Sequence, residues 1–209
     1  MHNYIFLLPL YNDWDSCTVL VDKINFQMKK LNKKCEILII DDCSNTMQEN
    51  FSSFSNIKKI DILSLKENLG SQKAISIGLQ YLYRIKKKMV ITILDSDGED
   101  DVNKIPEMIK NAETDEDKVI VSTRTKRQEN ILFKLLYFIH KMLTFLFTLN
   151  WISYGNYSSF QSNQLKKILS QKSSWLAFSA CVAKNCNIKK VKAERKKRLD
   201  GISKLSFLG

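Results

Sequence analysis

The sequence predicts an α/β protein with one doubly wound, mostly parallel sheet, and three observations support that prediction. First, short apolar runs rich in β-branched residues alternate with longer segments whose apolar residues recur at three- and four-residue spacing. Second, polar and acidic residues gather directly after several of the apolar runs. Third, no Pro-, Ser- or Gly-rich linker, repeat or low-complexity segment divides the 209 residues. Strands that alternate with helices form a parallel sheet with helices on its faces.

Five strands and three helices are expected in residues 1–125. The strands are Tyr4–Leu10, Cys35–Ile40, Ile60–Leu65, Val90–Leu94 and Val119–Ser122. The helices are Asp15–Leu31, capped by Asp15 or Ser16, then Ser71–Tyr83, and Val102–Ile109. The carboxyl ends of parallel strands lie along one edge of a sheet, so residues that follow the strands are expected to be neighbours.

The strand Val90–Leu94 leads into an acidic loop. Five carboxylates fall within residues 95–101, and Gly98 permits a tight turn among them. Carboxylates this close repel one another unless a cation lies among them. A solvated acidic loop that caps the next helix also explains the cluster. Its position after a buried strand, where open α/β sheets bind ligands, favours a metal site.

Three strand ends carry distinctive side chains: Tyr11-Asn12-Asp13, Asp41-Asp42 and Asp95-Ser96-Asp97. No GxGxxG follows the first strand, and Pro9-Leu10-Tyr11 does not allow the close backbone approach that a dinucleotide pyrophosphate needs. An Asp-x-Asp after a central strand instead suits Mg²⁺ or Mn²⁺, which bind few carboxylate oxygens and complete their shell with phosphate and water. The pattern favours an ion that bridges the diphosphate of a nucleotide substrate.

The net charge is confined to the second half of the chain. Residues 1–110 carry 15 Lys/Arg and 15 Asp/Glu, whereas residues 111–209 carry 18 and 7, so the whole net charge of +11 arises there. A basic half is typical of proteins that bind nucleic acid or anionic lipid, although a solvated Lys-rich surface has the same composition. Lys189–Arg198 contains no aromatic residue, unlike surfaces that bind single-stranded nucleic acid. No nucleic-acid partner is therefore expected.

The cysteines argue against a zinc site. The five cysteines form no CxxC pair, and the two histidines are far apart in sequence. An odd number of cysteines fits a reduced cytosol, and Met1–Leu10 is too short for a signal peptide.

Ile131–Leu149 is predicted to be an amphipathic helix. Its narrow polar stripe consists of Asn130, Lys134, Tyr137, Lys141, Thr144 and Thr148, and apolar residues surround it. Two lysines and His140 argue against a membrane span. A helix at the membrane interface and a helix packed on the sheet explain the pattern equally well.

Five motifs resemble those of one enzyme family. They are Pro9-Leu10-Tyr11-Asn12-Asp13, Ile40-Asp41-Asp42-Cys43-Ser44, Asn68-Leu69-Gly70, Asp95-Ser96-Asp97 with Glu99, and Arg198-Leu199-Asp200-Gly201-Ile202-Ser203-Lys204. In this order and spacing they resemble the inverting family 2 glycosyltransferases with the GT-A fold, in particular the polyprenol-phosphate branch with its dolichol-phosphate-mannose-synthase-like proteins. The resemblance covers nearly the whole chain. It implies one catalytic domain, with a nucleotide-sugar half (1–125) and an acceptor and membrane-interface half (126–209).

The resemblance implies a role for residues in each motif. For the nucleotide these are Pro9, Tyr11, Asp13, Asp41, Asp42, Asn68 and Gly70, with Asp42 or Asp41 accepting a hydrogen bond from the base. For a Mg²⁺ or Mn²⁺ cofactor and the donor diphosphate they are Asp95, Asp97 and Glu99. The catalytic set is Asp95, Asp97, Arg124 and Arg198, and the acceptor site is Arg124, Arg198, Ser203 and Lys204.

The implied activity is the inverting transfer of a sugar from a UDP-sugar, or secondly GDP-mannose, to a polyprenyl phosphate or glycan. The enzyme is expected in the cytoplasm, bound peripherally at the inner face of a membrane through anionic lipid or a membrane protein. Two other hypotheses stay open. One is a non-catalytic GT-A-like partner protein truncated from a membrane enzyme, and the less favoured one is a basic nucleic-acid-binding protein.

The chain departs from the family pattern at two places. Cys43 stands where relatives have glycine, which is expected to tighten the nucleotide loop. Residues 153–157 lie where relatives often carry an acidic residue near the acceptor, so the sequence identifies no catalytic base. A phosphate acceptor is already anionic and needs none, whereas a sugar hydroxyl does.

Overall fold

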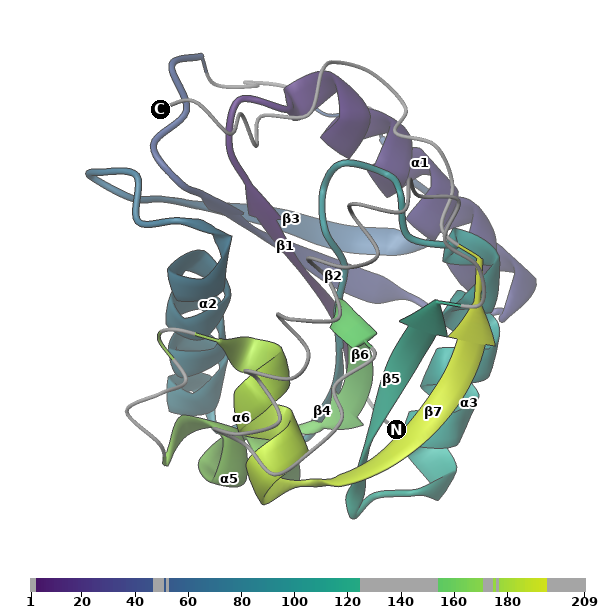
Figure 1. The fold of residues 1–209 in the computed structure, drawn as a ribbon. Helices are drawn as coiled ribbons and strands as arrows, with labels where there is room; N and C mark the ends of the chain where they lie inside the picture. Colours follow the sequence, from purple (N-terminus) through teal and green to yellow (C-terminus); the bar gives the residue numbers. More distant parts are fainter. Residues whose placement is uncertain are drawn as a thin grey trace, which may run out of the picture.

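A computed structural model describes residues 3–46, 51, 53–124, 154–170, 175 and 177–194. In these ranges seven strands form one sheet in the order β3-β2-β1-β4-β6-β5-β7, with helices on both faces (Figure 1). The strands are β1 Asn3–Leu10, β2 Cys35–Asp41, β3 Ile57–Ser64, β4 Met89–Ile93, β5 Lys118–Arg124, β6 Tyr154–Gln161 and β7 Asn187–Ala193. The helices are α1 Trp14–Lys30, α2 Ser71–Ile85, α3 Ile105–Thr114, α5 Leu165–Leu169 and α6 Phe178–Asn185, with short 3₁₀ helices η1 Val102–Lys104 and η2 Ser162–Gln164.

One strand, β6, runs against its neighbours. The pairs β1–β2, β2–β3, β1–β4 and β5–β7 are parallel, whereas β6 lies antiparallel between β4 and β5. The sheet is therefore mostly parallel, which confirms the predicted fold class. Ser158 of β6 pairs with Ile93 of β4, and Tyr154 pairs with Thr123 of β5. Because β6 is reversed, its first residues lie beside the last residues of β4 and β5.

Both faces of the sheet are covered, which explains the unbroken apolar runs of the central strands. On β1, Phe6 and Leu8 pack with the side chains of α1 and α3, while Leu7 packs with those of α2 and α6 on the other face. All three are fully buried. A methyl group added to Gly78 of α2 would come within 2.4 Å of Leu7 Cδ1. The mid-helix glycine thus allows α2 to lie close against the sheet.

Several boundaries and elements differ from the sequence prediction. Helix α1 begins at Trp14 with Asp13 as its N-cap residue, so the predicted caps Asp15 and Ser16 are wrong. The strands β6 and β7 were not predicted, because neither contains an apolar run. β6 is rich in small polar residues, and one of them bonds to the neighbouring strand inside the sheet: Thr92 Oγ1 of β4 and Ser159 Oγ of β6 share a hydrogen bond of 2.8 Å. β7 carries three lysines among its seven residues, and lysines are typical of an edge strand.

Part of the acceptor half lies outside the described residues. This applies to the predicted helix 131–149 and to Arg198, Ser203 and Lys204. Among the helices that are described, none combines the length and the apolar character needed to cross a membrane.

Candidate active site

The loops that follow β1 and β2 are joined at the carboxyl edge of the sheet. The Asn12 N–H donates to Ser44 Oγ at 2.8 Å, and Asn12 Oδ1 accepts from the Asn45 N–H at 2.7 Å. β4 is the other neighbour of β1, so Asp95-Ser96-Asp97 leaves the sheet at the same edge. This arrangement confirms the prediction that the three strand ends are neighbours.

Asp42 is buried at this edge and holds the start of α2. Its Oδ1 accepts from the Leu69 N–H and its Oδ2 from the Gly70 N–H, both at 2.7 Å. Gly70 is the N-cap residue of α2 and has a φ of 86°, a conformation that favours glycine. Charge-assisted hydrogen bonds to two successive N–H groups fix this loop. Asp42 therefore has a structural role, and its contact with a nucleotide base stays a prediction.

Asp41 and Cys43 shape the same loop. Asp41 is also buried, and its Oδ1 accepts from the Ser44 N–H at 3.1 Å. Cys43 has a φ of 65°, in the left-handed region that glycine adopts without strain. Its thiol lies 3.7 Å from the Lys66 carbonyl oxygen, to which it donates weakly. This backbone conformation is consistent with the glycine that the family resemblance places at this position.

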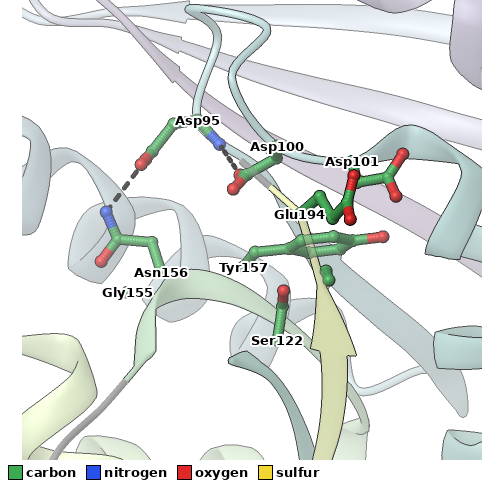
Figure 2. A pocket seen from close by; sticks show the side chains of 9 residues that line it. Asp95, Asp100, Asp101, Ser122, Gly155, Asn156, Tyr157 and Glu194 are labelled. Carbon is green, nitrogen blue, oxygen red and sulfur yellow. Dashed lines mark hydrogen bonds between the residues drawn. The ribbon is translucent and has the colours of Figure 1, made fainter. Parts of the chain in front are cut away.

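Some carboxylates of the acidic loop 95–101 stabilise the loop itself. Asp97 Oδ1 accepts from the Glu99 N–H at 3.0 Å, and Asp101 caps η1 by accepting from the Asn103 N–H at 3.2 Å. Asp100 Oδ2 accepts from the Asp95 N–H at 3.2 Å (Figure 2). These contacts are the capping role that was considered for this cluster, and the ligand role stays a prediction.

A pocket beside Asp95 is built from separate parts of the chain (Figure 2). It is lined by Asp95, Asp100, Asp101, Ser122, Gly155, Asn156, Tyr157, Ala193 and Glu194, which come from the acidic loop, β5, β6 and the end of β7. Asn156 donates through Nδ2 to Asp95 Oδ1 at 2.9 Å. The family resemblance placed residues 153–157 near the acceptor, but it assigned no role to Asn156 or Tyr157. Their position depends on the reversed direction of β6.

Tyr157 is buried in this pocket and stays neutral. Burial raises the pKa of its hydroxyl well above 10, and the carboxylates of Asp100 and Asp101 raise it further. Within the described part of the chain the hydroxyl has no hydrogen-bond partner, which costs roughly 1–3 kcal/mol. A hydroxyl with so high a pKa cannot serve as a general base at neutral pH.

The remaining predicted site residues fall into three groups. Pro9 is buried in β1, beyond the last residue that pairs with β4, so its missing N–H leaves no gap in that ladder. Tyr11 is exposed in the loop after β1, and Asp13 is the N-cap residue of α1. Arg124 is the last residue of β5, opposite Ala193 of β7. The roles of all four in binding stay predictions.

The predicted metal ligands also stay a prediction. In the ranges that the structure describes, no group of three or more His, Cys, Asp or Glu side chains is arranged to hold an ion. Asp95, Asp97 and Glu99 lie together on the loop after β4, with carboxylate oxygens of the type that Mg²⁺ and Mn²⁺ bind.

Comparison with known proteins identifies the class of protein. The sequence model described as glycosyl transferase family 2 matches residues 6–179, most of the chain. The protein therefore belongs to glycosyl transferase family 2. The resemblance drawn from the five motifs is confirmed at the level of the family.

Curated relatives point to a narrower group. The chain is 29% identical over 136 residues to an undecaprenyl-phosphate 4-deoxy-4-formamido-L-arabinose transferase of Pectobacterium atrosepticum, and 28% identical over 131 residues to the Yersinia enterocolitica enzyme of the same name. These matches cover 64% and 61% of this chain but only 40% and 38% of the two enzymes. The matched region therefore spans about two fifths of their length.

Solved structures of glycosyltransferases share the fold. Glucosyl-3-phosphoglycerate synthase from Mycobacterium tuberculosis, in complex with Mn²⁺, UDP-glucose and phosphoglyceric acid, superimposes with a TM-score of 0.58. It is 13% identical in sequence, and the match covers 94% of this chain and 73% of that one. S. aureus TarS 1–349 in complex with UDP-GlcNAc gives a TM-score of 0.51 at 16% identity, covering 94% and 59%. The chain thus has the GT-A fold.

Proposed function

We propose that this protein is a glycosyltransferase that moves a sugar from a nucleoside-diphosphate sugar to a polyprenyl phosphate, with a glycan as the second choice of acceptor. The observation that carries the proposal is the meeting of three strand ends at one edge, with Asp42 holding the start of α2 and Asp95 beside the pocket. Open α/β sheets bind nucleotides at this edge. The names of the sequence relatives, which specify undecaprenyl phosphate, support the acceptor.

A UDP-sugar is the first choice of donor and GDP-mannose the second. Two structural neighbours were solved with a UDP-sugar, which supports uridine. We assign Tyr11, Asp13 and the Asp41-Asp42 pair to the nucleoside, together with the Asn68-Leu69-Gly70 loop. Buried Asp42 already accepts two N–H groups, so exposed Tyr11 is the side chain best placed to cover a base.

We assign a Mg²⁺ or Mn²⁺ to Asp95 and Asp97, with Glu99 as a further ligand. These ions take oxygen ligands, and at phosphate-binding sites one or two carboxylates are enough because phosphate and water complete the shell. A site of this kind needs no preformed cage of three protein ligands. When bound, the ion would stabilise the charge that develops on the leaving diphosphate. The Mn²⁺ in a structural neighbour supports the choice.

The proposed reaction is a single displacement with inversion. An acceptor oxygen forms a bond to the anomeric carbon while the bond from that carbon to the diphosphate breaks, and the nucleoside diphosphate leaves with the electron pair. Arg124 and Arg198 are assigned to phosphate groups, with Ser203 and Lys204 at the acceptor. Residues 153–157 lie where the family resemblance places an acidic residue, and within them Asn156 supplies a neutral amide beside Asp95. An anionic phosphate attacks without a base, so the amide favours phosphate over a hydroxyl.

The direct test is calorimetric titration of the whole chain with UDP, GDP and ADP, each with and without MnCl₂. We expect UDP to bind most tightly of the three, and more tightly with MnCl₂ than without it. A transfer assay with UDP-sugars and undecaprenyl phosphate then tests the acceptor. A folded protein that binds none of these nucleotides in the presence of Mn²⁺ would contradict the proposal.

We further propose that the enzyme works peripherally at the cytoplasmic face of a membrane. The charge of +11 confined to residues 111–209 and the exposure of Lys190 and Lys192 on β7 support this location. Each basic side chain near anionic lipid contributes about 1 kcal/mol, and salt weakens the attraction. Co-sedimentation with phosphatidylglycerol vesicles should therefore fall as salt rises. No binding at low salt would contradict this location.

The alternative function is that of a non-catalytic partner protein. The nucleotide titration and the transfer assay together separate the two functions, because a non-catalytic partner can bind UDP but transfers no sugar.

A further inference from the structure

Asp95 receives a series of three hydrogen bonds that begins at the first residue of α6. The N–H of Phe178, the first residue of α6, donates to Gln72 Oε1 at 2.8 Å. Gln72 lies in the first turn of α2, and its Nε2 donates to Asn156 Oδ1 at 3.0 Å. Asn156 then donates through Nδ2 to Asp95 Oδ1 at 2.9 Å, the contact drawn in Figure 2. Residues from α6, α2 and β6 thus act on one carboxylate.

The Phe178 N–H at one end and the Asp95 carboxylate at the other determine the direction of all three hydrogen bonds. A backbone N–H can only donate, so Gln72 must present its oxygen to Phe178 and its NH₂ group to Asn156. An ionised carboxylate can only accept, so Asn156 must present its NH₂ group to Asp95. Both side-chain amides therefore have one orientation that satisfies all three hydrogen bonds. The orientation of both amides is therefore fixed by the protein alone, before any ligand binds.

The elements that carry this series of hydrogen bonds are themselves held in place. Gln72 lies two residues after Gly70, and the Gly70 N–H donates to Asp42 Oδ2 at 2.7 Å. Asp95 is also held through its backbone, because its N–H donates to Asp100 at 3.2 Å. The first turn of α2 therefore connects the two carboxylates, Asp42 and Asp95, that the sequence assigns to the nucleoside and the diphosphate.

We propose that Asn156 and Gln72 are positioning residues, which together hold the carboxylate plane of Asp95 in the orientation that serves the metal and diphosphate of the donor. The inference rests on the proposed function, in which Asp95 is a metal ligand. Partners that orient a ligating carboxylate typically change metal affinity 10–100-fold when they are removed. Neither residue contacts the reacting atoms in this scheme, and each acts only through Asp95.

Gln72→Glu is the sharpest variant because it keeps the shape of the side chain and removes its donor. The glutamate still accepts from the Phe178 N–H, but it has no N–H for Asn156 Oδ1. Asn156 can donate to this carboxylate only if its amide turns over. Asn156 then points Oδ1 instead of Nδ2 at Asp95. We expect Gln72→Glu and Asn156→Ala each to weaken Mn²⁺-dependent UDP binding about tenfold. Binding of UDP without metal should not change.

Two controls separate positioning from charge and from damage to the fold. In the Asn156→Ala background, Gln72→Glu should have no further effect, because the link to Asp95 is already broken. Gln161→Glu changes a buried glutamine at the far end of the same strand, β6, where Nε2 donates to the Ala112 carbonyl at 3.1 Å. It should lower the melting temperature and leave Mn²⁺-dependent UDP affinity unchanged.

The experiment is calorimetric titration of UDP into each full-length variant, with and without MnCl₂, with circular dichroism as the check on folding. If the wild type shows no Mn²⁺-dependent UDP binding, the proposed function itself fails. If the wild type binds and Gln72→Glu binds equally well, the positioning role is overturned. An equal loss from Gln72→Glu in the presence and absence of Asn156 would assign the effect to the added charge and also overturn it.

Discussion

The two edges of the sheet differ in how their charged side chains are arranged. At the amino edge, where the strands begin, basic and acidic side chains lie in pairs: Lys33 with Glu113, and Lys118 and Lys189 with Asp115. At the carboxyl edge, five carboxylates share residues 95–101. Opposite charges at the amino edge add a little stability, whereas like charges at the carboxyl edge reduce it.

The backbone shows the same contrast. Near the amino edge, Asn32 and Lys86 have positive φ at the ends of α1 and α2, where a left-handed residue commonly closes a helix. At the carboxyl edge, Asn12 and Cys43 have positive φ in the loops after β1 and β2. Proteins keep locally unfavourable features mainly where function needs them. The difference supports the proposed ligand site at the carboxyl edge and a structural role for the amino edge.

The largest expected effect is that of Asp97→Asn, which should separate function from stability. Asparagine keeps an oxygen that accepts the Glu99 N–H, so the turn is retained. The loss of one charge should weaken Mn²⁺-dependent UDP binding roughly 100-fold. The free energy of unfolding should stay equal or rise, because repulsion within the loop falls. Calorimetry and urea denaturation measure the two quantities, and unchanged affinity would contradict the role of Asp97.

Asp42→Ala should lower both the UDP affinity and the free energy of unfolding, because Asp42 has a structural role at the carboxyl edge. The substitution removes the charged acceptor of the Leu69 N–H and of the Gly70 N–H, and leaves the Gly70 N–H only its 3.1 Å hydrogen bond to Asn68 Oδ1. We expect a loss of about 2 kcal/mol in unfolding free energy and weaker UDP binding. Asp41→Ala, which removes the acceptor of a single N–H, is the matched control with a smaller expected loss. Urea denaturation that shows equal stability for Asp42→Ala and wild type would refute the anchoring role.

Cys43→Gly tests whether the left-handed backbone of the nucleotide loop carries strain. Glycine removes the steric cost of a side chain at a φ of 65°, so stability should rise by up to about 1 kcal/mol. Lys86→Gly, at a similar φ of 55° at the end of α2, is the control outside the site. Only Cys43→Gly should also change UDP affinity. Thermal unfolding in which Cys43→Gly melts below wild type would argue against strain at this residue.

Glu113→Gln tests the amino edge. Glu113 accepts hydrogen bonds from Lys33 and from the Tyr4 hydroxyl, and glutamine keeps an acceptor but loses the charge. Because the pair is partly exposed, we expect a loss of about 0.5 kcal/mol in unfolding free energy. UDP binding should be unchanged. A measurable drop in nucleotide affinity would break the distinction between the two edges.

The smallest expected effect is a pH dependence at the amino edge. Hydrogen bonds from Lys189 and Lys118 lower the pKa of Asp115 below its usual 3.8. Its folded-state pKa is therefore below its unfolded-state value, so its contribution to stability is present above about pH 4 and is lost as the pH falls through the lower value. Urea denaturation across this range should show a shallower acid loss for Asp115→Asn than for wild type. Identical pH profiles would show that these ion pairs add nothing.

Local sequence patterns predicted much of the carboxyl edge. Asp42 and Asp95 were recognised because each follows an apolar strand, and parallel strands that alternate with helices end along one edge. Cys43 was recognised as a departure from the family pattern. Its φ of 65° lies in the left-handed region that favours glycine, the residue expected at this position. Because strand–helix–strand connections have a fixed hand, short motifs that follow parallel strands can be assigned to one edge of the sheet.

The α/β architecture could be predicted from the sequence, because strands covered on both faces need unbroken apolar runs such as Phe6–Leu8. The residues that surround Asp95 depend on the tertiary fold. The strand β6 has no apolar run, and its reversed pairing with β4 is what brings Asn156 to Asp95 across 61 positions of the chain. Gln72 joins the same contact from α2, 84 positions before Asn156. Pairing of this kind is set by the packing of distant segments, and no local spacing in the sequence encodes it.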